Sequence, residues 1–392
     1  MSPTARSEGF TAAGREGLHA AAQRPVDDGL VPGLVALASR GAEAHVEALG
    51  TLAVGGEPVA RDAIFRIAST TKPITAAATL ALVAEGLLDL DAPVDRLLPE
   101  LEGRRVLRQV DGAIDDTVPA SRPITTRDLL TFTFGFGMSI DMFTAVEPWP
   151  VVEATQALNL AAIGPPDPSI PHDSDSWIAA LASLPLLAQP GERWLYNTGA
   201  QVLGVLLARA AGQTFAEVLR MRIFEPLGMR DTGFYTPHHD RLATAYQPTP
   251  DGLAVHDGPD GVWSRPPAFC DGAAGLVSTA DDLLAFARML LRGGSPVLPR
   301  HAVSAMTTDQ LSPSQKAYGA LVPGFFVENS WGLGQAVYAS GAYGWDGGLG
   351  TTWLVDPRRD LTMIVLTQRM FESPQPPQLH RDLQAAAYAG LA

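Results

Sequence analysis

The sequence predicts an α+β fold in which both ends of the chain form one antiparallel sheet flanked by helices, with a mostly helical domain inserted between them. Strand patterns occur near the two ends, and helical patterns dominate from about residue 70 to residue 290. A length of 392 residues also suggests two sub-domains rather than one core. We expect a sheet domain at 1–70 plus 275–392 and a helical domain with lid-like loops at 71–274.

The first elements are strands. Residues 33–53 are typical of a hairpin of two short strands around "SRGAEA". A third candidate strand, "AIFRIA", leads directly into Ser69. Helical patterns then follow at 73–86, 177–184, 200–211, 214–223 and 280–292. Residues 100–190 are the least regular part of the chain, and "IGPPDPSIPHDSDS" within them is typical of a loop.

Strand patterns return near the C-terminus. The segments are "SWGLGQAVY", "TTWLVD" and "LTMIVLT", and the last two are joined by the turn "PRRD". The segment "QLHRDLQAAAYAG" then predicts a closing helix. These late strands must pair with the early hairpin if the two termini share one sheet.

Composition excludes several classes of function. A hydrophobic fraction of 46% with 18% charged residues is typical of a globular protein. The net charge of −14 argues against a nucleic-acid partner, because such binding needs basic side chains to neutralise phosphates. No apolar run approaches the length needed to cross a bilayer, so we expect no integral membrane protein. The start "MSPTARSEGF" and the single Cys270 favour a cytoplasmic location, and the sequence leaves the oligomeric state open.

Ser69 and Lys72 are the first candidate catalytic pair. Pro73 places a helix start close to Ser69, which is itself a good N-cap residue, so Ser69 and Lys72 lie one turn apart on one face. Backbone N–H groups at a helix start can stabilise an oxyanion, and a desolvated lysine can take the proton of a hydroxyl. The alternative is that Ser69 only caps the helix and Lys72 is solvated.

Several ordered segments carry a more specific signal. The chain resembles serine hydrolases with the class C β-lactamase fold, most closely family VIII carboxylesterases. That group also includes D-aminopeptidases and acyltransferases of the lovastatin-synthesis type. The segments that carry the resemblance are "FRIASTTKPITAAATLALVAEGLLDLDAPV", "PLLAQPGERWLYNTGAQVLGVLLARAAGQTFAEVLRMRIFEPLGMRDTGF", "GAAGLVSTADDLLAFARMLL" and "GWDGGLGTTWLVDP".

The resemblance assigns roles to two further motifs. Tyr196 in "WLYNTGAQVLG" matches the tyrosine that shares the proton of the nucleophile with the lysine, and we expect a phenolate beside a lysine ammonium. Thr198 stands where β-lactamases carry Asn, a departure that weakens the expectation of amide recognition. Trp345 takes the place of the lysine of K-T-G, and Asp346 adds an anion, so anionic substrates should be disfavoured.

The same match predicts the oxyanion hole and a substrate pocket. The backbone N–H groups of Ser69 and Gly348 would hold the oxyanion, and Gly347 would permit close approach of the backbone to the substrate. The segment "LLTFTFGFGM" and the residues after it contribute apolar side chains that either line the pocket or belong to the core. They are Phe132, Phe134, Phe136, Met138, Met142, Phe143 and Trp149.

Other catalytic schemes find less support. The G-x-S-x-G motif of lipases and the P-loop motif are absent, and His238 and His239 lack a further metal-ligand pattern, so we expect neither a metal nor an organic cofactor. We expect a carboxylesterase that hydrolyses small, short-acyl esters through a serine acyl-enzyme. The alternatives are a β-lactamase or D-amino-acid peptidase, an acyltransferase on the same site, or a non-catalytic scaffold or sensor.

Overall fold

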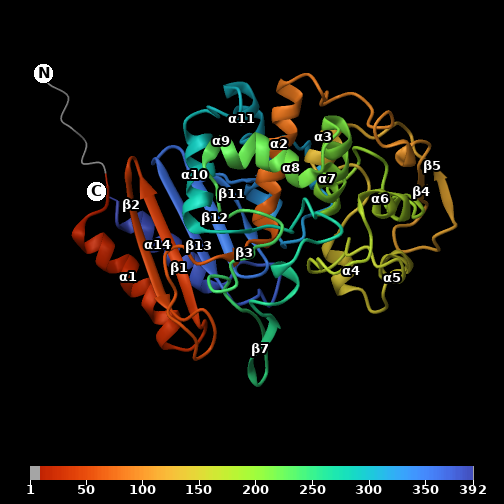
Figure 1. The fold of residues 1–392 in the computed structure, drawn as a ribbon. Coiled ribbons are helices and arrows are strands. Elements are labelled where there is room, and N and C mark those ends of the chain that lie inside the picture. The colour runs from red at the N-terminus through yellow and green to blue at the C-terminus, as the bar shows by residue number, and fades with distance from the viewer. Residues whose placement is uncertain (1–8, 392) are drawn as a thin grey trace, which may run out of the picture.

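The structure is a computed structural model that describes residues 9–391, and its centre is a seven-stranded antiparallel sheet (Figure 1). The strand order is β2-β1-β13-β12-β11-β10-β9. The strands are β1 (Gly33–Arg40), β2 (Glu43–Gly50), β9 (Ser330–Trp331), β10 (Ala336–Val337), β11 (Tyr343–Gly347), β12 (Thr351–Asp356) and β13 (Leu361–Thr367).

The two ends of the chain share this sheet, which confirms the predicted fold class. Strand β1 pairs with β2 through a tight turn at Gly41, whose φ of 60° favours glycine, and it also pairs with β13 with Leu34 opposite Thr367. The segment "SWGLGQAVY" forms two short strands, β9 and β10, instead of one. Strand β11 has no counterpart among the predicted strands, because its glycines hide the β pattern.

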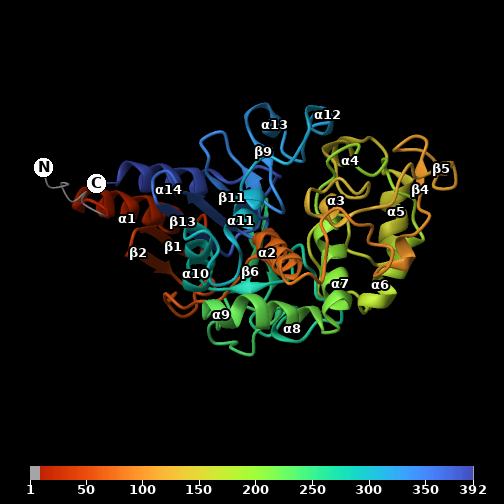
Figure 2. The ribbon, with the colours of Figure 1, turned by 90° about the horizontal axis from the view of Figure 1, so that it is seen from above.

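Alternation along β1 explains why almost every residue of the strand is buried. Leu34, Ala36 and Ala38 pack in one core with α1 (Ala12–Asp27) and α14 (Gln378–Ala389). Val35 and Leu37 point to the opposite face and join the larger core, which includes α2 (Thr71–Ala84) and α10 (Ala280–Leu291). Figure 2 shows α1 and α14 on one side of the sheet and α10 on the other. The sheet is thus covered on both faces.

Most of the regular secondary structure between the two halves of the sheet is helical, as predicted. Helix α7 (Thr198–Ala211) packs against α2, and Thr279 caps α10 by accepting a hydrogen bond from the Asp282 N–H. The further helices are η2 (Pro99–Leu101), α3 (Thr126–Leu130), α4 (Ile140–Thr144), α5 (Pro150–Ala157), α6 (Ser174–Ala182), α8 (Phe215–Leu219), η3 (Arg220–Phe224), α9 (Glu225–Leu227), η4 (Val262–Ser264), α11 (Arg300–Met306), α12 (Pro313–Lys316) and α13 (Phe325–Glu328).

Within residues 9–391, three two-stranded pairs lie outside the main sheet: β3 (Phe65–Arg66) with β8 (Val277–Ser278), β4 (Arg105–Leu107) with β5 (Thr117–Pro119), and β6 (Ala245–Thr249) with β7 (Gly252–Asp257). The candidate strand "AIFRIA" is therefore reduced to β3, which joins β8 and not the central sheet. This pairing brings the chain before Ser69 next to the segment that leads into α10. The domain boundaries after residues 70 and 274 stay a prediction.

Among residues 9–391, no single helix has the length and apolar composition needed to cross a membrane. One pair, α7 together with the helical stretch at 215–227, passes such a test jointly, but the two parts meet at an angle of 82°. Helix α7 contributes Val202, Leu203 and Leu206 to the core. Its apolar character therefore has an explanation in packing.

Candidate active site

Ser69 lies in a tight 3₁₀ turn, η1 (Ala68–Thr70), between β3 and α2. The Ile67 N–H donates to the Leu276 carbonyl over 3.0 Å, which fixes the entry to this turn. Ala68 has a φ of 43°, a left-handed conformation that costs roughly 1–2 kcal/mol for a residue with a side chain. Such strain is characteristic of functional sites. Thr70, and not Ser69 as predicted, directly precedes α2, because the extra turn displaces the serine toward the cavity.

Lys72 points from the first turn of α2 toward Ser69. Its Nζ donates to Ser69 Oγ over 3.0 Å and to the Ala273 carbonyl over 3.0 Å, and its side chain is 1% exposed. Burial lowers the pKa of Lys72 to about 7, and the negative charge of Asp271 offsets only part of this effect. A lysine with this pKa is partly neutral near pH 7 and can accept a proton.

Asp271 belongs to the same constellation, although no sequence motif singles it out. Its Oδ1 accepts the Ala273 N–H over 2.6 Å, and its Oδ2 accepts Nε2 of Gln201 over 3.2 Å. Burial raises the pKa of Asp271, while hydrogen bonds and the charge of Lys72 act in the opposite direction. The one signal in the sequence was an acidic residue directly before the apolar segment "GAAGLVST".

Tyr196 lies on the other side of Lys72, whose Nζ is 4.4 Å from the centre of the phenol ring. The indole Nε1 of Trp345 donates to the Tyr196 hydroxyl over 2.6 Å. Burial raises the pKa of Tyr196 well above its usual value, and hydrogen bonds with Ser69 and Trp345 lower it by less. The expected phenolate is therefore not favoured, because burial destabilises the charged form of Tyr196 by more than these two hydrogen bonds stabilise it.

The two glycines after Asp346 differ in what surrounds them. A side chain at Gly347 would meet the Ile67 carbonyl oxygen at 2.3 Å, so glycine lets β11 lie against the nucleophile turn. Gly347 does not line the cavity, which corrects its prediction as a substrate contact. Gly348 does line it, and its N–H donates to no other described residue. Gly348 is thus placed beside the cavity with an unused donor.

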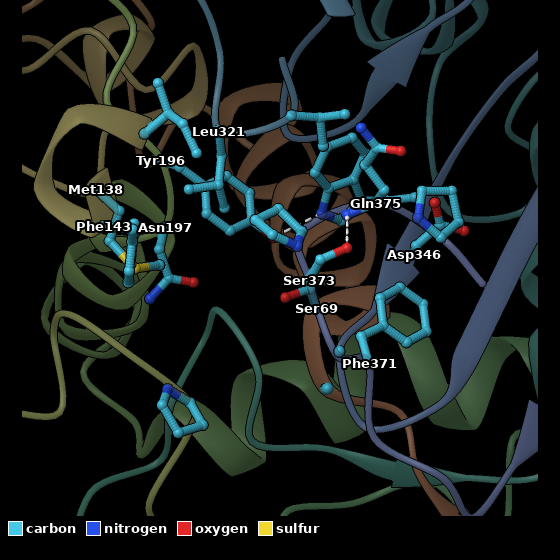
Figure 3. A pocket seen from close by; sticks show the side chains of 18 of the residues that line it. Ser69, Met138, Phe143, Tyr196, Asn197, Leu321, Asp346, Phe371, Ser373 and Gln375 are labelled. Carbon is cyan, nitrogen blue, oxygen red and sulfur yellow. Dashed lines mark hydrogen bonds between the residues drawn. The ribbon is translucent and has the colours of Figure 1, made fainter. Parts of the chain in front are cut away.

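A cavity of about 900 Å³ opens above Ser69 (Figure 3). Ser69, Tyr196, Trp345, Asp346 and Gly348 all line it. Most of the other lining side chains are apolar: Met138, Ile140, Phe143, Pro165, Pro166, Ala274, Leu321, Val322, Pro323, Phe325, Leu349, Met370, Phe371, Pro374 and Pro376. The volume and the apolar walls are typical of a small-molecule site.

The predicted aromatic pocket is largely core. Phe132, Phe134, Phe136 and Trp149 are buried and do not line the cavity, whereas Met138 and Phe143 do. An apolar sequence pattern cannot separate these two environments. Phe132, with a φ of 59°, stacks edge-on to Tyr196 with the ring centres 5.8 Å apart, so it supports the tyrosine from behind.

Thr198 is also not a cavity residue, because it is fully buried and its hydroxyl donates to the Ala162 carbonyl over 3.3 Å. Asn197 lines the cavity in its place, with a φ of 85°. The segments 321–325 and 370–376, together with Asn329 and Tyr338, were not predicted to line the site. Apart from Phe325, which begins α13, they are loop residues that tertiary packing brings to the cavity, and the sequence carried no signal for them.

The histidines considered as metal ligands lie elsewhere. His239 contacts Asp260 with an Nδ1–Oδ1 distance of 2.6 Å on the surface. No group of three or more His, Cys, Asp or Glu side chains suited to a metal ion is present within residues 9–391. His380 is buried, and burial lowers its pKa to about 3, so it stays neutral.

Comparison with known proteins identifies the family of the chain. The Beta-lactamase family model matches residues 18–387. Protein Rv1367c of Mycobacterium tuberculosis is 37% identical over 96% of this chain and 93% of its own length. Esterase EstB of Burkholderia gladioli is 33% identical over 85% of this chain and 84% of its own. The solved structure of EstCE1, described as a hydrolase with promiscuous acyltransferase activity, superposes with a TM-score of 0.80 at 24% identity and covers 96% of this chain and 100% of that one. The chain belongs to the Beta-lactamase family.

Proposed function

We propose that this protein is a carboxylesterase that forms an acyl-enzyme on Ser69. One observation carries the proposal: Nζ of Lys72 lies 3.0 Å from Ser69 Oγ, and burial lowers the pKa of this lysine to about 7. A serine hydroxyl is a weak nucleophile unless a neighbouring base removes its proton. Lys72 satisfies the geometric and the electrostatic requirement for that base.

In the acylation step, Oγ of Ser69 attacks the ester carbonyl carbon while neutral Lys72 accepts the hydroxyl proton. The carbonyl oxygen becomes an oxyanion, which the N–H groups of Ser69 and Gly348 stabilise. The Tyr196 phenol then donates its proton to the departing alkoxide, and the Lys72 ammonium returns a proton to Tyr196. The bond between the carbonyl carbon and the alcohol oxygen breaks, and the alcohol leaves.

Deacylation reverses these roles. Tyr196 accepts a proton from a water molecule as it passes its own phenolic proton to neutral Lys72, and the water oxygen attacks the acyl carbonyl. The same two N–H groups hold the second oxyanion. The tetrahedral intermediate collapses by breaking the bond to Ser69 Oγ, which takes the proton back from the Lys72 ammonium. The acid leaves and the free enzyme is restored without a metal or an organic cofactor.

The lining of the cavity favours uncharged esters over anionic substrates. Its walls are apolar, and its charged side chains, Asp271, Asp346 and Glu372, are all acidic. Similarity to esterase EstB points to the same class of reaction. We place the protein in the cytoplasm, a proposal that agrees with its single cysteine, Cys270.

A chain-length series of p-nitrophenyl esters tests this function on three proteins. The wild type should show turnover, highest on short acyl chains, and Ser69→Ala should lose it. Ser373→Ala is the matched control, because Ser373 lines the same cavity and its hydroxyl accepts only a local hydrogen bond from the Gln375 N–H. Turnover that survives in Ser69→Ala would defeat the assignment of the nucleophile.

A further inference from the structure

The charged side chains that line the cavity are all acidic. Three carboxylates line it, those of Asp271, Asp346 and Glu372, and no lysine or arginine is among its described lining residues. Glu372 is paired with Arg369 over 2.7 Å, and Asp271 is held by Gln201 and the Ala273 N–H. Asp346 has no ion-pair partner in the described part of the chain. It is the carboxylate of the cavity that lacks a compensating charge.

Asp346 is held in place by its strand. It lies in β11 directly opposite Thr352 of β12, and hydrogen bonding with the Thr352 side chain favours the ionised form. Burial acts more strongly and raises the pKa of Asp346 to about 6, so the side chain is mostly ionised at neutral pH. A half-buried carboxylate without an ion-pair partner gains from a cation supplied by a ligand, because an unpaired charge that is partly removed from water is costly.

Aromatic rings gather around the same end of the cavity. Phe325, Tyr338 and Trp345 all line it. The ring centres of Phe325 and Trp345 are 5.8 Å apart, and those of Phe325 and Tyr338 are 6.4 Å apart. The negative charge of Asp346 contributes to a raised pKa of Tyr338, which places the carboxylate within electrostatic reach of that ring. In Figure 3, Asp346 lies on the opposite side of the view from Met138 and Phe143.

We propose that the enzyme selects esters that carry an ammonium group, and that this cation is seated between the Asp346 carboxylate and the rings of Phe325, Tyr338 and Trp345. This inference rests on the proposed esterase function and names its substrate class. Aromatic faces attract cations, and the attraction is strongest where the cation is desolvated. The Asp346 carboxylate also attracts the cation electrostatically, and a neutral ester gains no such attraction.

A purely repulsive role for Asp346 makes a different prediction. If the carboxylate only excludes anions, a cationic ester and a neutral ester of the same shape should react equally well. If the cation is bound, the cationic ester should be preferred, and the preference should depend on Asp346. Acetylcholine and neohexyl acetate form such a pair, because they differ mainly in having a quaternary nitrogen or a quaternary carbon.

The experiment measures acetate release from both esters and compares the ratio of their kcat/KM values within each protein. The wild type should prefer acetylcholine by about tenfold or more, the discrimination expected from one desolvated cation site. In Asp346→Asn the ratio should fall to about one. Glu328→Gln is the matched control, because Glu328 is exposed, belongs to α13 and does not line the cavity. It should keep the wild-type ratio.

Failure of this inference can be told apart from failure of the proposed function. Hydrolysis of neohexyl acetate at a rate equal to or above that of acetylcholine overturns the cation site and leaves the esterase intact. If the wild type hydrolyses neither these esters nor p-nitrophenyl acetate, the esterase assignment falls. The cation site is then decided by calorimetry with choline and neohexyl alcohol on Ser69→Ala. Tighter binding of choline that Asp346→Asn abolishes supports the site, and equal binding refutes it.

Discussion

The indole N–H of Trp345 donates a hydrogen bond of 2.6 Å to the phenolic oxygen of Tyr196. This contact joins the strand that borders the cavity to the residue that we propose as the proton relay. Because it comes from a neutral donor, it holds the phenol without adding a positive charge to the cavity. The resemblance to class C β-lactamases places a lysine at this position, so the exchange preserves a donor and removes a cation.

Replacing Trp345 by Phe should lower kcat/KM for p-nitrophenyl acetate about fivefold, since one net hydrogen bond is worth about 1 kcal/mol. The loss should appear mainly in kcat, because the contact positions a proton donor. Trp149→Phe is the control, as Trp149 is a buried tryptophan outside the cavity. Equal kinetics for Trp345→Phe and the wild type would remove Trp345 from the proton-transfer network.

The pH dependence of kcat/KM should report the ionisation of Lys72. The lysine must be neutral to accept the Ser69 proton, and its pKa is lowered from 10.5 to about 7. Activity should therefore rise as pH increases and level off above pH 7, when measured from about pH 5 to about pH 9 with correction for spontaneous ester hydrolysis. A rate independent of pH across that range would contradict Lys72 as the base.

Replacing Asp271 by Asn should move this profile. The charge of Asp271 raises the pKa of Lys72, so its removal disfavours the ammonium form and lowers the pKa further. The acidic limb of the kcat/KM profile should shift to lower pH, while the amide oxygen can still accept the Ala273 N–H. An unchanged or alkaline-shifted limb would mean that Asp271 does not control the lysine.

Lys72→Met should remove activity and increase stability. The pKa of Lys72 is lower in the folded state than the ordinary 10.5, so the unfolded chain binds more protons between about pH 7 and pH 10.5, and the stability of the wild type rises with pH in that window. Below about pH 7, Lys72 is charged in both the folded and the unfolded state, so the burial of its charge lowers the free energy of unfolding by the full amount. At neutral pH, the variant should be more stable by roughly 1–3 kcal/mol, because methionine has no charge to desolvate. A large loss of stability in thermal unfolding would show that the hydrogen bonds of Lys72 outweigh its burial.

The acidic cavity also predicts discrimination against β-lactams. Nitrocefin carries a carboxylate, and the cavity offers acidic side chains and no lining cation. Its kcat/KM should be roughly a thousandfold below that of p-nitrophenyl acetate, the size expected from about 4 kcal/mol of missing or repulsive interactions. Comparable turnover of the two substrates would favour the β-lactamase alternative. Product analysis with an added alcohol or amine acceptor separates hydrolysis from acyl transfer.

Local sequence patterns predicted those elements whose contacts join residues close together in the chain. The hairpin of β1 and β2, the turn between β12 and β13 and the helix α10 all appear close to their predicted positions. Helix α1 was missed because its sequence, with Pro25 inside it, has a weak apolar face. Strand β11 was missed because glycine-rich segments lack a clear β pattern.

The catalytic centre was more predictable than the cavity around it. Ser69, Lys72 and Tyr196 carry motif signals, and the structure brings the three side chains together. The cavity wall depends on loops such as 321–325 and 370–376, whose positions follow from tertiary packing. Phe143 lines the cavity and Phe136 lies in the core, a difference that the pattern of apolar residues does not determine.

The central claim is that Lys72 activates Ser69 as a nucleophile, and covalent labelling with a fluorophosphonate tests it most directly. Intact-mass and peptide analysis of the wild type should show one adduct, located on Ser69, and the rate of labelling should fall by at least about a thousandfold in Lys72→Met, as expected for loss of the base. An adduct on another residue, or labelling of Ser69 at an unchanged rate without the lysine, would contradict it.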